Sequence, residues 1–328
     1  MTVNKTSEPL FPKEKEDTIR ENYGDWQTNY EFAKSVCLYL KNRGIVPDIV
    51  VEPTCGVGNF IAAAIDVFET VKKVYGVEIF KGYVDQTEKK LQEYQKNNLI
   101  VSYELYNADV FNFDFREIAN QNPDQNILVI GNPPWVTNSG LGKNDGVNLP
   151  VKGNINKTKG IEAITGKGNF DIAESICNQI IDAFSHHGNT HIALLVKNSV
   201  VKNIIHRQHF HPRRIQDVRQ LVFDAKKEFN VSVPASLFEC HIGNDCQKEC
   251  ISYDFYTKRI THSFGWVNEA FVSNIQDYGR TSFLDGQSPL IWRSGIKHDC
   301  SKVMELSLND STYQNGLKEV VDVDDITV

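Results

Sequence analysis

The sequence has no run of 18 or more apolar residues, although 41% of its 328 residues are hydrophobic. A helix that spans a bilayer needs such a run, so the sequence predicts no membrane span. Met1 to Leu10 also lack the apolar core of a secretory signal. The seven cysteines are odd in number and lack the spacing of a disulfide framework. These absences favour a cytoplasmic protein with reduced thiols.

Basic residues are in the minority, because 35 Lys and Arg face 42 Asp and Glu and give a net charge of −7. This balance argues against a generic nucleic-acid binder, which relies on Lys and Arg to hold phosphates. The distribution is uneven, however. Between Lys197 and Lys227, eight basic residues stand against two acids, an excess of +6. This basic segment is either a local nucleic-acid contact or a merely solvated face.

A zinc-binding pattern is also missing. Cys240, Cys246 and Cys250 have His241 nearby, but their C-x5-C-x3-C spacing lacks the C-x2-C pair of a zinc knuckle. Cys240 ends one strand-like run and Cys250 begins another. We interpret the segment from His241 to Cys246 as the turn of a β-hairpin, and we expect no metal site.

The dinucleotide-binding fingerprint is incomplete. A buried strand from Asp48 to Glu52 leads into a turn with Gly56 and Gly58, after which an apolar helix opens at Phe60. The two glycines let the backbone approach a ligand with no Cβ in the way. The fingerprint needs a third glycine, and Ile61 takes that place. The turn is therefore better matched to a ligand without a pyrophosphate than to a nicotinamide or flavin dinucleotide.

Acids stand at the ends of successive predicted strands. Glu52 ends the first strand, Glu78 ends the strand from Val74, and Asp109 ends the stretch from Tyr103. In an open α/β sheet, an acid such as Glu78 can accept two hydrogen bonds from a ribose diol, and Asp109 could accept from an adenine amine. Any one of these acids alone is better explained as a solvated loop residue. Three in order, ahead of the motif below, favour a binding site.

The tetrapeptide Asn132-Pro133-Pro134-Trp135 follows the apolar run Leu128 to Gly131. It suits the methylation of an amine conjugated to a flat ring, whose delocalised lone pair makes it a poor nucleophile. An Asn oxygen and a neighbouring carbonyl can accept both amine hydrogens and localise the lone pair. The prolines hold these acceptors still, and the aromatic ring offers a face to an extruded base. The plainer interpretation is a strand followed by a Pro-Pro turn.

In this order and spacing, these motifs resemble those of the S-adenosylmethionine-dependent N6-adenine DNA methyltransferases of bacterial restriction–modification systems. The resemblance runs from Tyr23-Gly24-Asp25-Trp26-Gln27-Thr28 through Gly168-Asn169-Phe170-Asp171 to about residue 240. It implies the cofactor S-adenosyl-L-methionine. The residues implied to hold it are Thr28, over its methionine end, and Glu52, Thr54, Cys55, Gly56, Gly58, Glu78, Asp109 and Asn132.

The resemblance also implies the chemistry. Asn132 and the carbonyl of Pro133 would orient the amine, Pro134 would keep the turn rigid, and Trp135 would stack on the flipped base. Phe229 would stack from the opposite side, with Phe223 as the alternative candidate. The implied product is adenine methylated at N6 in duplex DNA, formed without a metal ion.

Strand and helix signals alternate from residue 48 to residue 131, which predicts a mostly parallel α/β sheet with crossover helices. The strands near 217–223, 231–240 and 250–256 predict an antiparallel edge hairpin, and the resemblance implies a Rossmann-like class I methyltransferase sheet. We expect a leader at 1–20, a catalytic domain at 21–260 and a C-terminal region at 261–328. That last region is either short or the start of a truncated target-recognition domain. The Gly-rich stretch 136–168 is either a loop that closes over a nucleotide or a surface insertion.

Two other functions remain open from the sequence. A protein-glutamine or RNA adenine methyltransferase can use the same Asn-Pro-Pro-aromatic motif, because a glutamine amide is also planar. A non-catalytic DNA-binding subunit could retain the fold, although the intact Asn132 and Glu78 argue against it. The expected partners are duplex DNA and a recognition subunit, a fused recognition domain or a cognate endonuclease.

Overall fold

The computed structural model describes residues 27–135, 171–286, 306–309, 312–315 and 317–321. The predicted leader and the Gly-rich stretch therefore lie outside the described residues. Among the described helices, none combines the length and the apolar character that a bilayer crossing requires.

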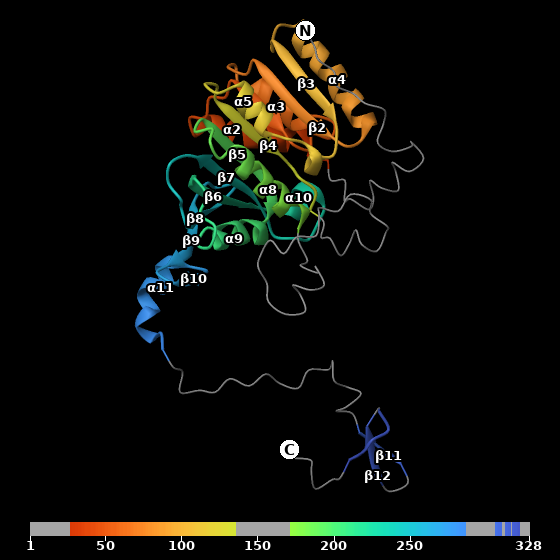
Figure 1. The fold of residues 1–328 in the computed structure, drawn as a ribbon, viewed down its shortest axis with the longest axis vertical. Coiled ribbons are helices and arrows are strands. Elements are labelled where there is room, and N and C mark those ends of the chain that lie inside the picture. Colours follow the sequence, from red (N-terminus) through yellow and green to blue (C-terminus); the bar gives the residue numbers. More distant parts are fainter. Residues whose placement is uncertain (1–26, 136–170, 287–305, 310–311, 316, 322–328) are drawn as a thin grey trace. The chain divides into compact units, whose positions relative to one another are not determined.

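Strands and helices alternate through the first half of the chain (Figure 1). After the helix α2 (Tyr30–Asn42), the strands are β1 (Ile49–Glu52), β2 (Lys73–Glu78), β3 (Ser102–Asn107), β4 (Ile127–Gly131) and β5 (Thr190–Lys197). The helices between them are α3 (Asn59–Val67), α4 (Lys81–Lys96), α5 (Arg116–Gln121) and α8 (Ile172–Ala183), with the 3-10 turn η1 (Val110–Asn112). These five strands pair in parallel, as predicted from the alternation.

The second half completes one ten-stranded sheet in the order β10-β9-β8-β6-β7-β5-β4-β1-β2-β3. Its elements are α9 (Asn198–Arg207), β6 (Ile215–Phe223), α10 (Ala225–Phe229), β7 (Ala235–Ile242), β8 (Glu249–Asp254), β9 (Ile260–Val267), β10 (Ala270–Val272) and α11 (Ile275–Thr281). β7 is antiparallel to both of its neighbours, β5 and β6. A mostly parallel sheet with an antiparallel edge is therefore confirmed.

The interpretation of His241 to Cys246 as a hairpin turn is wrong. β8 pairs with β6, in parallel, and the chain after β7 crosses over β6 to reach it. The reason is that both edges of β7 already carry a partner, β5 on one side and β6 on the other. The free edge of β6 is the place left for a further strand.

The centre of the sheet is covered on both faces. Every residue of β1 and of β4 is buried, although successive side chains of a strand point to opposite faces. Such near-continuous apolar runs are typical of parallel strands between two helical layers. The carboxyl ends of β1, β2, β3 and β4 therefore meet at one edge. The chain order reverses next to β1, which is where open α/β sheets bind ligands.

The compact unit that holds this sheet extends to Arg280. The boundary predicted at residue 260 thus falls at the first residue of β9, and both β9 and β10 belong to the sheet. Residues from Thr281 form a second unit. Its described part contains the 3-10 turn η2 (Ser282–Leu284) and a small antiparallel sheet of β11 (Leu306–Asn309), β12 (Thr312–Asn315) and β13 (Val320–Val321).

Candidate functional site

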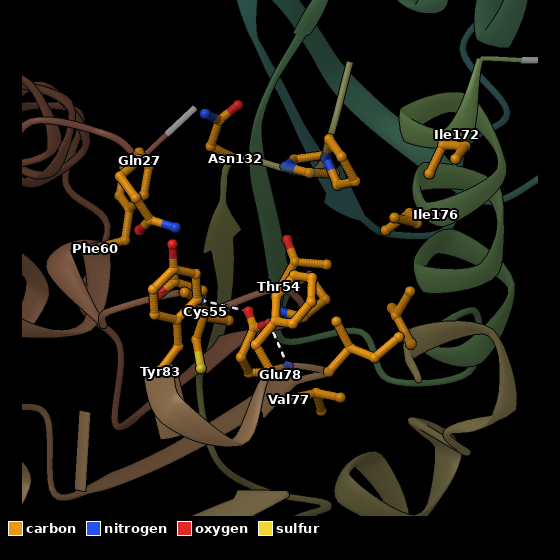
Figure 2. A pocket seen from close by; sticks show the side chains of 18 of the residues that line it. Gln27, Thr54, Cys55, Phe60, Val77, Glu78, Tyr83, Asn132, Ile172 and Ile176 are labelled. Atoms are coloured by element: carbon orange, nitrogen blue, oxygen red, sulfur yellow. Dashed lines mark hydrogen bonds between the residues drawn. The ribbon is translucent and has the colours of Figure 1, made fainter. Parts of the chain in front are cut away.

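A cavity lies at the carboxyl ends of β1, β2 and β4, with about 1020 Å³ of empty space including its open mouth. Figure 2 shows Gln27 and Tyr83 on one side of it and Ile172 and Ile176 on the other. The predicted residues that line it are Thr28, Glu52, Thr54, Cys55, Gly56, Glu78, Asp109, Asn132, Pro133, Pro134 and Trp135. Gly58 and Phe229 are not among the lining residues, although both lie next to residues that are.

The glycine turn is tightly constrained. Gly56 and Gly58 have φ of +50° and +75°, in the left-handed region. The N–H of Gly56 donates to Glu78 Oε2 at 2.8 Å, and that of Val57 donates to Gln27 Oε1 at 3.3 Å. The N–H of Gly58 donates to the carbonyl of Cys55 at 2.7 Å. All three amides are thus used within the protein, whereas a phosphate-binding loop presents them to the ligand. This geometry supports the prediction of a ligand without a pyrophosphate.

The buried Glu52 is tied to the start of α3. One of its oxygens, Oε2, accepts from the N–H of Ile61 at 3.3 Å, so a carboxyl group faces the positive end of the helix. Burial raises the pKa of Glu52 well above its usual range, and the bond from Ile61 opposes that shift.

The other two acids also brace the backbone. Glu78 is buried and accepts from the N–H of Gly56 and, at 2.9 Å, from that of Phe80. Asp109 caps η1 by accepting from the N–H of Phe111 at 3.0 Å, and burial raises the pKa of its carboxyl. A carboxylate offers about four lone-pair directions, so these bonds are compatible with a further donor from a ligand.

The lining disfavours anionic ligands. Its described residues include three with carboxyl groups: Glu52, Glu78 and Asp109. They include no Lys, Arg or His. The hydroxyl oxygen of Thr54 is buried in the wall and has no hydrogen-bond partner among the described residues. A buried hydroxyl normally finds a partner. The cavity therefore fits a cationic ligand rich in hydroxyl and amine groups, as the predicted cofactor is.

The tetrapeptide lines this cavity and directly follows β4. The ring of Trp135 is 7% exposed, and its Nε1 donates to the carbonyl of Leu195 at 3.0 Å. Phe229 meets it edge-on with ring centroids 5.2 Å apart, and Phe223 is 6.3 Å away. Both aromatic candidates thus contact Trp135. Their stacking on a base stays a prediction.

Sequence reasoning missed several lining residues: Gln27, Pro53, Asn59, Phe60, Val77, Ile79, Phe80, Tyr83, Ala108, Val110, Phe111, Ile172 and Ile176. Many of them are adjacent in sequence to predicted lining residues, so their positions at the ends of strands could have identified them. Tyr83 was also within reach, because it lies in the first turn of α4, a helix that follows Glu78 within the predicted alternation of strands and helices.

The basic segment does not form one patch. Lys197 pairs with Asp171 at 2.9 Å, and Arg219 pairs with Asp217 at 2.9 Å. The side chain of Arg213 is 12% exposed and donates to Asn178 Oδ1 at 2.6 Å. The segment also leaves the cavity edge along α9 and returns along β6, since β6 runs in the same direction as β5. Lys226 and Lys227, in α10, follow the end of β6 and are therefore exposed cations of the segment at that edge.

No group of three His, Cys, Asp or Glu within the described ranges is placed to hold a metal ion. Cys240 and Cys250 are buried in the sheet, whereas Cys246 is exposed. Of the predicted segment Gly168 to Asp171, Asp171 is described, and it caps α8 by accepting from the N–H of Ala173 at 3.0 Å.

Comparison with known proteins gives one informative relative. No family model matches the chain. Type II methyltransferase M.NspV from Nostoc sp. (strain ATCC 29411 / PCC 7524) is 38% identical over 305 residues, which are 92% of this chain and 62% of that protein. The chain thus spans about three fifths of the length of this relative.

Two solved structures have similar chain traces at low identity. A type I restriction–modification methyltransferase subunit from Streptococcus thermophilus has a TM-score of 0.44 and 14% identity, with 79% of this chain and 52% of that chain covered. A modification subunit of a putative type I restriction enzyme from Vibrio vulnificus YJ016 has a TM-score of 0.44 and 13% identity, with 94% and 61% covered.

The relative at 38% identity is a methyltransferase, and the cavity fits a cationic ligand, so both lead to the same interpretation. They support S-adenosyl-L-methionine as the cofactor and the class I methyltransferase sheet, both as predicted. The chain is a homologue of a Type II methyltransferase, as its resemblance to the methyltransferases of restriction–modification systems predicted.

Proposed function

We propose that this chain carries the catalytic machinery of a DNA methyltransferase that methylates adenine at N6. One observation carries the proposal: Asn132-Pro133-Pro134-Trp135 borders the same cavity as the strand-end acids Glu52, Glu78 and Asp109. An amine-orienting motif and a site for a cationic nucleoside therefore share one space. The name of the relative, a Type II methyltransferase, agrees with this activity.

Each end of the cofactor has candidate residues. Glu78 would accept from the ribose diol and Asp109 from the adenine amine. Glu52, the orphaned hydroxyl of Thr54 and Thr28 would surround the methionine end. When bound, S-adenosylmethionine supplies an electrophilic methyl group on a sulfonium. The described wall has no cation that would oppose this positive charge, and a bound cation would in turn favour the ionised form of its carboxyl groups.

The protein's own contribution to the chemistry is positioning. The side-chain oxygen of Asn132 and the carbonyl of Pro133 would accept the two hydrogens of the target amine and so localise its lone pair. Two consecutive prolines fix φ and keep these acceptors still. Holding both reactants in line, and aiming fixed dipoles at the charge that develops, are large sources of rate enhancement.

The aromatic group of Trp135, Phe229 and Phe223 would receive the extruded base. Extrusion costs a few kcal/mol, and stacking on an aromatic side chain returns about 1–3 kcal/mol per base. Around the cavity edge, Lys226 and Lys227 of α10 are exposed, and so are Lys258 and Arg259 in the turn between β8 and β9. We propose that these cations hold DNA phosphates, and that a recognition domain, a recognition subunit or a cognate endonuclease acts with the chain.

Transfer of tritium from methyl-labelled S-adenosylmethionine tests the proposal. Duplex DNA of mixed sequence, RNA and soluble protein are offered in parallel, and labelled DNA is digested to nucleosides. We expect label in N6-methyladenine, and none when the protein is omitted. Label on a cytosine amine would overturn the adenine assignment. Label on protein glutamine or RNA, with none on DNA, would overturn the substrate class.

A further inference from the structure

One face of α4 contacts the glycine turn through side-chain hydrogen bonds. Tyr83, Thr87 and Lys90 are spaced i, i+4 and i+7 and therefore lie along one side of the helix. Tyr83 lines the cavity. The hydroxyl of Thr87 donates to the carbonyl of Gly56 at 3.0 Å. The ammonium of Lys90 donates to the carbonyl of Val57 at 2.7 Å and to Asn59 Oδ1 at 3.0 Å.

The hydrogen bond between Lys90 and Asn59 is followed by a second one, which links Asn59 to the neighbouring part of the cavity wall. The amide of Asn59 donates from Nδ2 to the carbonyl of Thr28 at 2.8 Å. Because Lys90 occupies the oxygen of that amide, it also fixes which way the nitrogen points. A second bond, from the N–H of Val57 to Gln27 Oε1, joins the same two segments. Lys90, Asn59 and Thr28 thus form a continuous path from α4 to the wall at Gln27 and Thr28.

The surroundings of Lys90 show that its contacts are more than a surface pairing. Burial lowers the pKa of the ammonium, and the nearby Glu52 opposes that shift. Lys90 itself is not a lining residue. Its neighbour Lys89 has the same charge on the same helix, but it is exposed.

We propose that Lys90, acting through Asn59, is a positioning residue that holds Gln27 and Thr28 against the cofactor and sets the cofactor affinity. This inference rests on the proposed function. The ligand it concerns is the cofactor, through the wall that faces its methionine end. Lys90 is not a lining residue of the cavity, so it would act on the cofactor through Asn59 and not by direct contact.

The main test is Lys90→Met, with Lys90→Arg as the rescue and Lys89→Met as the matched control. Calorimetric titration of the full chain with S-adenosylmethionine should show affinity about tenfold weaker for Lys90→Met, as expected when one charge-assisted bond is removed. Lys90→Arg retains a donor and should recover most of it, and Lys89→Met should bind like wild type. In the methylation assay, the KM for the cofactor should rise while kcat stays close to wild type.

Asn59→Asp tests the path separately, because it keeps an acceptor for Lys90 and removes the donor to Thr28. Asn59 also lines the cavity, where a new carboxyl group can itself attract a cationic cofactor, so amide exchange near Thr28 is the decisive measurement for this variant. In the cofactor-free protein, amide hydrogen exchange near Thr28 should be faster in both variants and unchanged in β4. Unchanged affinity and exchange in Lys90→Met, or unchanged exchange in Asn59→Asp if Lys90→Met does not fold, would overturn this inference alone. A wild-type chain that binds no S-adenosylmethionine would overturn the proposed function instead.

Discussion

At the scale of the residue, the strand-end acids already accept hydrogen bonds from backbone N–H groups when no ligand is bound. Glu52 faces the first turn of α3, Glu78 holds the N–H groups of Gly56 and Phe80, and Asp109 caps η1. Their positions could be predicted from the sequence, because a parallel sheet brings its carboxyl ends to one edge. Their backbone bonds could not, because these depend on the path of the turns that follow.

Glu78→Ala should therefore have two effects. Loss of the charged acceptor should weaken binding of S-adenosylmethionine by about 1.5–3 kcal/mol. It also leaves two N–H groups without their acceptor, so the free energy of unfolding should fall. Glu78→Gln keeps one acceptor oxygen and should be milder in both respects. Calorimetry and chemical denaturation measure the two quantities, and unchanged affinity in Glu78→Ala would remove Glu78 from the site.

Asn132→Ala should separate chemistry from binding. Its side-chain oxygen is proposed to accept mainly from the substrate amine, so cofactor affinity should stay close to wild type while methyl transfer is nearly abolished. The measurement is label transfer by the purified, folded variant, with Asn132→Asp as a comparison that keeps an acceptor oxygen. A similar rate in Asn132→Ala would show that the amine is oriented by other groups.

At the scale of the element, sequence periodicity predicted where the strands and helices lie. It was less able to predict which strands are neighbours in the sheet. The alternation from β1 to β5 is simple, because sequential parallel strands need crossover helices. The strands after β5 do not follow chain order, and β8 lies beside β6 and not β7. Short-range turn chemistry cannot show which edge is already occupied. The support from Thr87 and Lys90 was missed for a related reason: a helical face is visible in the sequence, but the loop that it meets is not.

Gly58→Ala tests how closely α4 packs on the glycine turn. A Cβ at Gly58 would lie 2.7 Å from Thr87 Cγ2, and the residue has φ of +75°. The left-handed conformation should cost about 1–2 kcal/mol, and the close approach to Thr87 should add to it. Gly44→Ala is the control, because Gly44 has φ of +85° and nothing within 4 Å of the added carbon.

Thr87→Ser removes the crowded methyl group and keeps the hydroxyl, so it should recover part of the stability that Gly58→Ala loses. Denaturation of wild type, Gly58→Ala, Thr87→Ser and the double variant in a double-mutant cycle gives the coupling energy. Equal losses of stability in Gly58→Ala and Gly44→Ala would mean that α4 can move away from the added carbon without a cost in free energy.

At the scale of the whole molecule, the basic segment is divided between opposite edges of the sheet. Reversing Lys226 and Arg259 to Glu, at the cavity edge, should weaken binding to DNA of any sequence. The salt dependence should become less steep by about one unit of slope for each phosphate that is no longer neutralised. Arg214→Glu with Lys248→Glu, at the start of β6 and β8 on the opposite edge, is the matched control. A larger loss of affinity in that control would place the DNA on the other side of the sheet.

The acid stability of the molecule should depend on a histidine pair that joins β5 to β7. The rings of His191 and His241 lie 4.4 Å apart. Burial, together with His241, lowers the pKa of His191 to about 4. The unfolded chain then binds more protons between about pH 4 and pH 6.5, so stability is present above that range and is lost as the pH falls through it.

His191→Gln should reduce this loss by about 2 kcal/mol, allowing for partial exposure of the ring. Urea denaturation at pH 7.5 and at pH 4.5 measures the difference between wild type and variant. A difference that does not change with pH would mean that His191 titrates alike in the folded and the unfolded chain.

The occupied amides of the glycine turn also bear on competition inside a cell. Adenine nucleotides share their adenosine part with the proposed cofactor. A nucleotide would bring its phosphates to a turn whose N–H groups are already bonded and to a wall with three acids and no described cation. The same turn that holds a nucleoside close would thus keep the pool of ATP from inhibiting the protein.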